Sequence, residues 1–168
     1  MKILITGSSG FIGFHLAKLL LEKKHKVQGY DSMNNYYDVK LKKARLNLLK
    51  KYPNFSFTKG TLENEKILKK TFKRFKPKIV IHLAAQAGVR YSIDKPHVYL
   101  KSNITGSFNV IEASHNVNVK HLIMASSSSV YGANKNIPFK ETDKTETQLS
   151  IYASTKKANE SMAHSYSN

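Results

Sequence analysis

The hydrophobic residues of this chain follow two alternating patterns. Short apolar runs rich in β-branched residues predict buried strands, whereas apolar residues that recur every three or four positions predict helices. Strands are predicted at residues 2–6, 26–31, 54–58, 78–83 and 120–125. Helices are predicted from just after Gly10 and at 38–51, 63–75, 96–116 and 150–166, with a polar loop at 132–148. This alternation favours right-handed crossovers and an α/β fold with a mostly parallel sheet.

Small and polar residues lie where the predicted strands end. Gly7 follows the first strand, Asp31 ends the second, Ala84 and Ala85 follow the fourth, and four serines at 126–129 follow the fifth. In parallel sheets the ligand binds beyond the carboxyl ends of the strands. The positions of these residues therefore predict one ligand site at this edge of the sheet.

The segment after the first strand has three glycines, Gly7, Gly10 and Gly13, at spacings typical of a pyrophosphate-binding turn. Gly7 would permit the tight turn, Gly10 would let backbone N–H groups approach the phosphates, and Gly13 would allow close helix–strand contact. The start of the following helix adds partial positive charge. The alternative is a structural turn without a ligand.

Asp31 lies 18 positions beyond Gly13. A carboxylate there can accept hydrogen bonds from both hydroxyls of an adenosine ribose and would repel a 2′-phosphate, which favours NAD over NADP. Asn34 and Asn35 lie close enough in sequence to assist. The alternative is a loop carboxylate that caps a turn.

Tyr152 and Lys156 are four residues apart in a predicted helix, so they share one of its faces. A phenol has an ordinary pKa of about 10, and bringing it near neutrality requires about 4 kcal/mol. An ammonium at ~4 Å supplies about that much at an effective dielectric constant of ~20. The pair therefore suggests acid–base chemistry beside a nicotinamide, on an alcohol or ketone carbon. Alone, the spacing is also common in surface packing.

Several other polar residues are candidates. A hydroxyl among Ser127, Ser128 and Ser129 can bond a reacting substrate oxygen, although each serine could simply belong to a polar turn. Arg90 either faces an anionic substrate or forms a structural ion pair. Asn103 either bridges the backbone and the site or is a surface amide. His82 is interpreted as a core histidine, and no metal site is predicted because no second histidine has suitable spacing.

Composition narrows the classes of protein. The 168 residues predict one domain, and 40% hydrophobic content argues against disorder. The net charge of +17 raises the possibility of a nucleic-acid partner, but only three of the 28 basic residues are arginines, so we expect a solvated lysine-rich surface and no nucleic acid. No apolar run is long enough to cross a membrane, the start of the chain is not a secretory signal, and the absence of cysteine fits a cytoplasmic protein.

The segments Thr6–Gly13 and Ser127–Gly132, with Tyr152-x-x-x-Lys156, together resemble the extended short-chain dehydrogenase/reductase family, in its nucleotide-sugar epimerase and dehydratase branch. Two further segments, Asp31–Asp38 and Ala84–Ser92, look like those of UDP-glucuronate 4-epimerases of the capsule-biosynthesis type. The resemblance implies a Rossmann-like, doubly wound parallel sheet with helices on both faces. It covers the whole chain.

The resemblance also implies roles for individual residues. Ser127 takes the position of the catalytic Ser/Thr, beside Tyr152 and Lys156. Leu62 would contact adenine through its backbone, because Thr61 replaces an aspartate common in the family. The remaining residues implied to bind the cofactor NAD are Gly7, Gly10, Phe11, Ile12, Gly13, Asp31, Asn35, Ala84, Ala85 and Asn103, with Tyr152 and Lys156.

The implied reaction is transient oxidation of a UDP-sugar at C4, followed by return of the hydride to the other face. Ser128 and Ser129 stand where the 4,6-dehydratases have an Asp-Glu pair, so dehydration is disfavoured, and these hydroxyls with Arg90 would hold a C6 carboxylate. Another sugar epimer, a decarboxylation and a non-catalytic NAD-binding module are the alternatives. Family members are about twice as long, so we expect residues 1–168 to be an N-terminal fragment that lacks the substrate-binding domain. We expect a homodimer through helices 96–116 and 150–166.

Overall fold

A computed structural model describes residues 1–167 of the chain. They fall into two compact units. The first unit comprises residues 1–84 and 109–124, and the second comprises residues 85–108 and the chain from 125 onward. The long helical segment therefore begins in the second unit and ends in the first.

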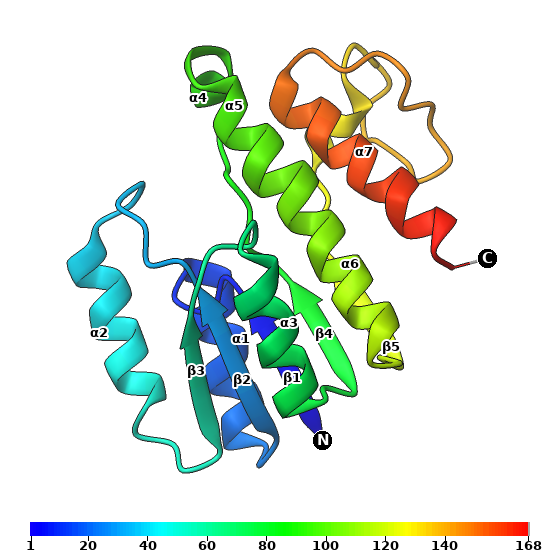
Figure 1. The fold of residues 1–168 in the computed structure, drawn as a ribbon. Helices are drawn as coiled ribbons and strands as arrows, with labels where there is room; N and C mark the ends of the chain where they lie inside the picture. The colour runs from blue at the N-terminus through cyan, green and yellow to red at the C-terminus, as the bar shows by residue number, and fades with distance from the viewer. Residues whose placement is uncertain (168) are drawn as a thin grey trace. The chain divides into compact units, whose positions relative to one another are not determined.

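The first unit contains a five-stranded parallel sheet (Figure 1). Its strands are β1 (Lys2–Thr6), β2 (Lys26–Asp31), β3 (Phe55–Lys59), β4 (Ile79–His82) and β5 (His121–Met124). Their order is β3-β2-β1-β4-β5, so that Ile3 of β1 pairs with Val27 on one side and Ile79 on the other. The predicted parallel sheet is confirmed, and β1, at its centre, is where the strand order reverses.

Helices cover both faces of this sheet, as predicted. On one face, α1 (Phe11–Glu22) and α2 (Val39–Leu49) enclose a cluster with the sheet: Ile3, Ile5, Phe14, Ala17, Leu21, Val27 and Leu49. On the other face, α3 (Glu65–Phe75) and the later part of α6 (Gly106–Asn116) enclose a second apolar cluster with the sheet: Leu4, Tyr30, Leu62, Leu68, Phe72, Val80, Val110 and Ala113. Each buried Leu or Phe contributes roughly 1.5–3 kcal/mol, so these clusters fix the doubly wound arrangement.

Side-chain caps determine where three helices begin. Asp38 accepts a hydrogen bond from the Lys40 N–H at 2.7 Å, and Asn64 accepts one from Ile67 at 3.1 Å. Ser150 accepts one from the Ala153 N–H at 3.1 Å, which confirms the predicted cap of α7 (Ile151–Ser165). Such caps typically contribute about 1 kcal/mol each.

The second unit is built mainly from helices. They are α4 (Val89–Asp94), α5 (Pro96–Tyr99), a π-helical segment η1 (Leu100–Thr105), the start of α6, a 3₁₀ turn η2 (Ser128–Tyr131) and α7. The helix α7 packs against α4, α5, η1 and η2. The prediction of one regular α-helix over 96–116 is wrong in its middle, where η1 widens the helical turn, and α4 and η2 were not predicted.

The loop at 132–148 contains neither helix nor strand, as predicted. The Phe139 ring stacks on Tyr131 of η2, with ring centroids 4.5 Å apart. Gly132, at φ +55°, has no room for a side chain because an added Cβ would collide with the Thr147 carbonyl. The two ends of this loop therefore lie against each other, and its middle packs on η2 through Phe139.

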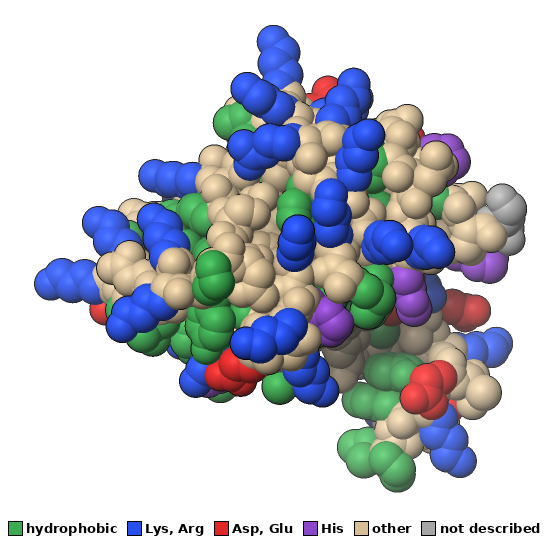
Figure 2. All heavy atoms as spheres, turned by 90° about the horizontal axis from the view of Figure 1, so that it is seen from below, with side chains coloured by type: hydrophobic (Ala, Val, Ile, Leu, Met, Phe, Trp, Pro, Cys, Tyr) green, Lys and Arg blue, Asp and Glu red, His purple; other side chains and the backbone are tan. Residues whose placement is uncertain are grey.

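Lysine and arginine side chains are spread over the face shown in Figure 2, with apolar and histidine side chains between them. This distribution agrees with the predicted lysine-rich surface, and the absence of a nucleic-acid partner stays a prediction. Within residues 1–167, no helix is both long enough and apolar enough to span a membrane.

Candidate active site

The glycine loop of the first unit is a tight turn between β1 and α1. Gly7 has φ +74° and donates its N–H to the Tyr30 carbonyl at 2.8 Å. A Cβ on Gly7 would lie 2.9 Å from the Ala84 nitrogen, and one on Gly13 would collide with the Gly7 carbonyl oxygen. A side chain at Gly7 would therefore push the loop away from the segment after β4, and one at Gly13 would push α1 away from the loop.

The helix α1 begins at the loop and exposes its first turn. Phe11 and Ile12 are 68% and 66% exposed, and the first intrahelical bond runs from the Phe14 N–H to the Gly10 carbonyl at 3.0 Å. The first N–H groups of a helix have no carbonyl partner within it and carry partial positive charge. This turn therefore offers free N–H groups of the kind that bind a pyrophosphate, and the assignment of Gly10, Phe11 and Ile12 to that group stays a prediction.

Asp31 joins the glycine loop to the loop after β2. Its carboxylate accepts the Ser9 N–H at 3.0 Å and the Met33 N–H at 2.8 Å, and the side chain is buried. The turn-capping alternative is thus part of its role. A carboxylate offers about four acceptor positions, so two remain for ribose hydroxyls. Asn35 lies exposed in the turn after this loop.

The segment after β3 is tethered from two sides. The Tyr30 hydroxyl donates to the Thr61 carbonyl at 2.8 Å, and the Asn109 amide donates to the Leu62 carbonyl at 3.0 Å. Burial, and secondarily the charge of Glu63, raise the pKa of Tyr30 to about 12. The backbone of Leu62, predicted to contact adenine, is therefore held rigidly. Asn109 was not predicted, since a lone amide on a helix gives little sign of its partner.

His82 has the structural role predicted for it. It is buried, and its Nδ1 lies 2.7 Å from the Thr6 hydroxyl, which also accepts the Ala84 N–H at 3.1 Å. These bonds hold Ala84 against Gly7. Residues 1–167 contain no group of three side chains able to bind a metal.

In the second unit, Tyr152 and Lys156 lie on α7 and differ in burial. Tyr152 is half-buried, whereas Lys156 is 6% exposed and donates its Nζ hydrogen to the Ala125 carbonyl at 2.7 Å. Burial lowers the pKa of Lys156. A surface-packing role for Lys156 is therefore wrong, because its ammonium lies inside the protein, where a charge is costly unless it has a partner.

The serine run after β5 forms a capped turn. Ser127 Oγ accepts the Ser129 N–H at 3.2 Å, and Ser126 donates to Glu160 of α7 at 2.5 Å. As an acceptor, the Ser127 hydroxyl still has its hydrogen to donate to a substrate oxygen. Ser128 is exposed and Ser129 is half-buried.

Two further candidates lie on the helices that pack against α7. Arg90, in the first turn of α4, is exposed and has no carboxylate partner within residues 1–167, so the ion-pair alternative is not supported. Asn103 is fully buried and bridges the backbone of Gln86 to Thr155, so it is not a surface amide. Ala85, half-buried, precedes Gln86.

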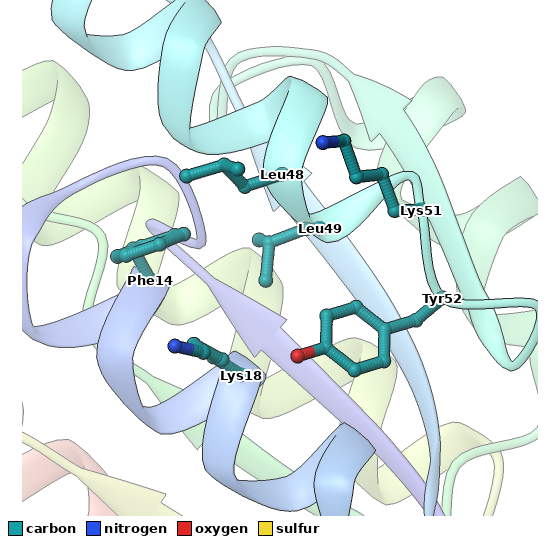
Figure 3. Close-up of a pocket in the computed structure, with 6 residues that line it drawn as sticks. All are labelled: Phe14, Lys18, Leu48, Leu49, Lys51 and Tyr52. Atoms are coloured by element: carbon teal, nitrogen blue, oxygen red, sulfur yellow. The ribbon is translucent and has the colours of Figure 1, made fainter.

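A separate apolar pocket of about 340 Å³ lies between α1 and α2 (Figure 3). It is lined by Phe14, Lys18, Leu48, Leu49, Lys51 and Tyr52. None of these is a predicted site residue. The Tyr52 hydroxyl, which points into it, donates to Glu22 at 3.2 Å.

A parallel sheet of this order with a glycine loop after its central strand defines a dinucleotide-binding α/β domain. The profile of the family described as GDP-mannose 4,6 dehydratase matches residues 4–168. The chain therefore belongs to this family of extended short-chain dehydrogenases/reductases, as the motifs predicted.

Individual relatives are similar over nearly the whole chain. Protein CapI of Staphylococcus aureus is 55% identical over 99% of this chain and 50% of the relative. The probable UDP-glucuronate 4-epimerase of Rhizobium meliloti is 47% identical over 99% of this chain and 49% of the relative. The chain thus spans about half the length of the curated relatives it matches.

Solved structures agree with this relationship. The UDP-glucuronic acid 4-epimerase of Bacillus cereus, in complex with UDP-glucuronic acid and NAD, aligns with a TM-score of 0.90 and 33% identity, over 99% of this chain and 52% of that one. The UDP-glucose 4-epimerase of Thermus thermophilus, in complex with NAD, aligns with a TM-score of 0.86 and 28% identity, over 99% and 50%.

Proposed function

We propose that this chain is the NAD-binding and acid–base part of a UDP-sugar 4-epimerase, with UDP-glucuronate as substrate, and that it is the N-terminal portion of a longer protein. The observation that carries the proposal is the buried Lys156 one helical turn from Tyr152 on α7. The names of the similar proteins support the substrate and the cofactor.

The first unit would bind the dinucleotide. The first turn of α1 would bind the pyrophosphate, Asp31 would accept the ribose hydroxyls, and the tethered backbone of Leu62 would contact adenine. Gly7 and Gly13 serve by keeping this backbone compact. When bound, NAD supplies reversible hydride acceptance, which allows the sugar to be oxidised at C4 and reduced again without net redox change.

The second unit would move the proton. Tyr152 takes the proton of the C4 hydroxyl as the 4-keto sugar forms. The sugar then rotates to present its other face, and Tyr152 returns the proton to the C4 oxygen as that carbon is reduced. Lys156 stabilises the phenolate, while its bond to the Ala125 carbonyl fixes the ammonium. Ser127, whose own oxygen caps η2, donates its hydrogen to the reacting oxygen. Each positioned proton donor or acceptor typically contributes 10²–10⁴-fold to the rate.

The choice of glucuronate rests on Ser128, Ser129 and Arg90. Neutral hydroxyls and an exposed guanidinium can hold a C6 carboxylate, and no carboxyl group stands at 128 or 129 to catalyse loss of water from the sugar. We expect Ser128→Ala with Ser129→Ala to weaken binding of UDP-glucuronate more than of UDP-glucose. Equal losses for the two sugars would refute this assignment.

The activity is tested with the full-length protein that carries this chain, supplied with UDP-glucuronate or UDP-galacturonate and followed by NMR. Either sugar should give the same equilibrium mixture. Release of carbon dioxide would instead indicate a decarboxylase, and binding of NAD without conversion of either sugar would indicate a non-catalytic module. The matched control is Tyr152→Phe, which should bind the sugars without interconverting them.

We propose in addition that the protein is a homodimer through the helices that carry exposed apolar residues in the second unit. Leu100 is 48% exposed, Phe108 41% and Ile151 42%, and the Phe108 ring lies 6.4 Å from that of Tyr166. Such residues are costly to leave in water, and a second copy would cover them. Light scattering should give twice the mass of one chain for the wild type and the mass of a single chain for Leu100→Glu. A monomeric wild type would exclude the dimer.

A further inference from the structure

Two buried side chains on the helical segment before α6 each reach in two directions. Tyr99 ends α5, and Asn103 lies four residues later in η1. Both are fully buried. Each contacts the segment Gln86–Gly88 on one side and α7 on the other. The segment Gln86–Gly88 and α7 lie far apart in the sequence, so the connection between them does not follow from local structure.

Asn103 uses both the oxygen and the nitrogen of its amide. Its Oδ1 accepts the Gln86 N–H at 2.7 Å, and its Nδ2 donates to the Gln86 carbonyl at 3.0 Å and to Thr155 Oγ1 at 3.2 Å. The side chain thus pairs with Gln86 as a neighbouring strand would. Thr155 in turn donates to the Tyr152 carbonyl at 2.8 Å. A continuous chain of hydrogen bonds therefore runs from Gln86 to the backbone of Tyr152.

Tyr99 makes the second connection. Its hydroxyl lies 2.7 Å from the Ala87 carbonyl and 2.5 Å from the Gly88 carbonyl, and a phenol has one hydrogen to share between them. The edge of its ring meets the ring of Tyr152 at 76°, with centroids 6.1 Å apart. Edge-to-face pairs of this kind contribute about 0.5–1.5 kcal/mol beyond their buried area, and they fix ring orientation.

The π-helical turn η1 is a second indication that this region has a functional role. Such turns are rare, and they occur frequently at functional sites, because they disturb the regular hydrogen bonding of a helix. Here η1 contains Asn103, whose side chain bonds Gln86 and Thr155 outside that turn. A helix face with only a packing role would be served by a regular α-helix with an apolar residue at this position.

We propose that Tyr99, Asn103 and Thr155 are positioning residues that together orient the Tyr152 phenol relative to the segment Gln86–Gly88, and so control the rate of proton transfer. The inference rests on the proposed function. None of the three residues needs to touch the sugar, since they act through the backbone and ring of Tyr152. Their loss should therefore lower kcat and leave KM for the nucleotide sugar nearly unchanged.

The decisive variant is Thr155→Val in the full-length protein, which removes one hydroxyl and keeps the shape of the side chain. A misplacement of about 1 Å can cost about 100-fold in rate, so we expect kcat to fall by roughly 10- to 100-fold, with KM within about twofold. Thr155→Ser should restore most of the rate. The matched control is Ser154→Ala, which removes an exposed hydroxyl bonded only within α7, to the Ser150 carbonyl at 3.1 Å.

A spectroscopic measurement separates this inference from the proposed function. The ring signal of Tyr152 in ¹³C-tyrosine-labelled protein, assigned with Tyr152→Phe, should move in Thr155→Val and in Tyr99→Phe but not in Ser154→Ala. Movement of the signal in an inactive full-length protein would defeat the epimerase proposal and still support the positioning role of these residues. An unmoved signal, or a kcat for Thr155→Val equal to that of Ser154→Ala, would overturn the positioning role.

Discussion

The two compact units differ in what fills their interiors. The first is centred on two apolar clusters on either side of a sheet, and apolar contacts tolerate small shifts. Among its described residues, the second buries only three apolar side chains, Tyr99, Val130 and Ala153, and a larger number of polar ones: Gln86, Ser92, Asn103, Ser107, Thr155, Lys156 and Asn159. Hydrogen bonds are directional, so this interior fixes orientation more sharply. Apolar packing thus stabilises the first unit, whereas directional hydrogen bonds orient the proposed acid–base residues of the second.

The largest expected effect concerns the second unit. Tyr152→Phe removes the proton acceptor and keeps the ring against Tyr99, so kcat of the full-length protein should fall by about 10²–10⁴-fold with little change in thermal stability. Tyr52→Phe is the control, because that hydroxyl bonds Glu22 in the first unit and should not affect the rate. Retained epimerisation in Tyr152→Phe would remove Tyr152 from the mechanism.

A glycine substitution tests the first unit. Gly13→Ala places a methyl group against the Gly7 carbonyl and should destabilise the unit by about 1–3 kcal/mol while abolishing NAD binding. Gly10→Ala is the matched control for stability alone, since its Cβ would meet the same oxygen at 3.1 Å and needs only a small adjustment. Urea unfolding compares the two variants, and NAD titration follows Gly13→Ala. Equal losses of unfolding free energy in the two variants would contradict the close packing described for the loop.

The tether of the adenine segment gives a smaller effect. Tyr30→Phe leaves the Thr61 carbonyl without its donor and should cost about 1 kcal/mol at neutral pH. The folded pKa of about 12 lies above the ordinary value of about 10, so the wild type loses stability as the pH rises between them. Its advantage over Tyr30→Phe should therefore shrink from pH 10 to 12. A constant difference in unfolding free energy would argue against a protonated, buried phenol.

The smallest effect is the pH dependence caused by Lys156. Burial lowers its pKa, so the folded protein binds fewer protons than the unfolded one between the lowered value and the ordinary value of about 10.4. The stability of the wild type relative to Lys156→Met should rise as the pH rises through this window. Urea unfolding at several pH values provides the comparison, and parallel curves would show that the ammonium is not desolvated.

The same contrast explains how much could be read from the sequence. The strands, the glycine turn and the Ser150 cap depend on local spacing and side-chain chemistry, and they were predicted correctly. The short helix α4 and the π-turn were not, because they depend on tertiary contacts. The bond of Asn109 to Leu62 joins residues 47 apart, and that of Asn103 to Thr155 joins residues 52 apart. No periodic pattern reveals such pairs.

The central claim is that the sugar is oxidised at C4 and reduced at the same carbon within one catalytic cycle. The most direct test supplies UDP-glucuronate deuterated at C4 to the full-length protein in ordinary water and locates the label by NMR. Our account predicts that UDP-galacturonate retains the deuterium at C4, with inverted configuration. Solvent hydrogen at C4 of the product, or loss of the deuterium without inversion of the configuration at C4, would contradict this account.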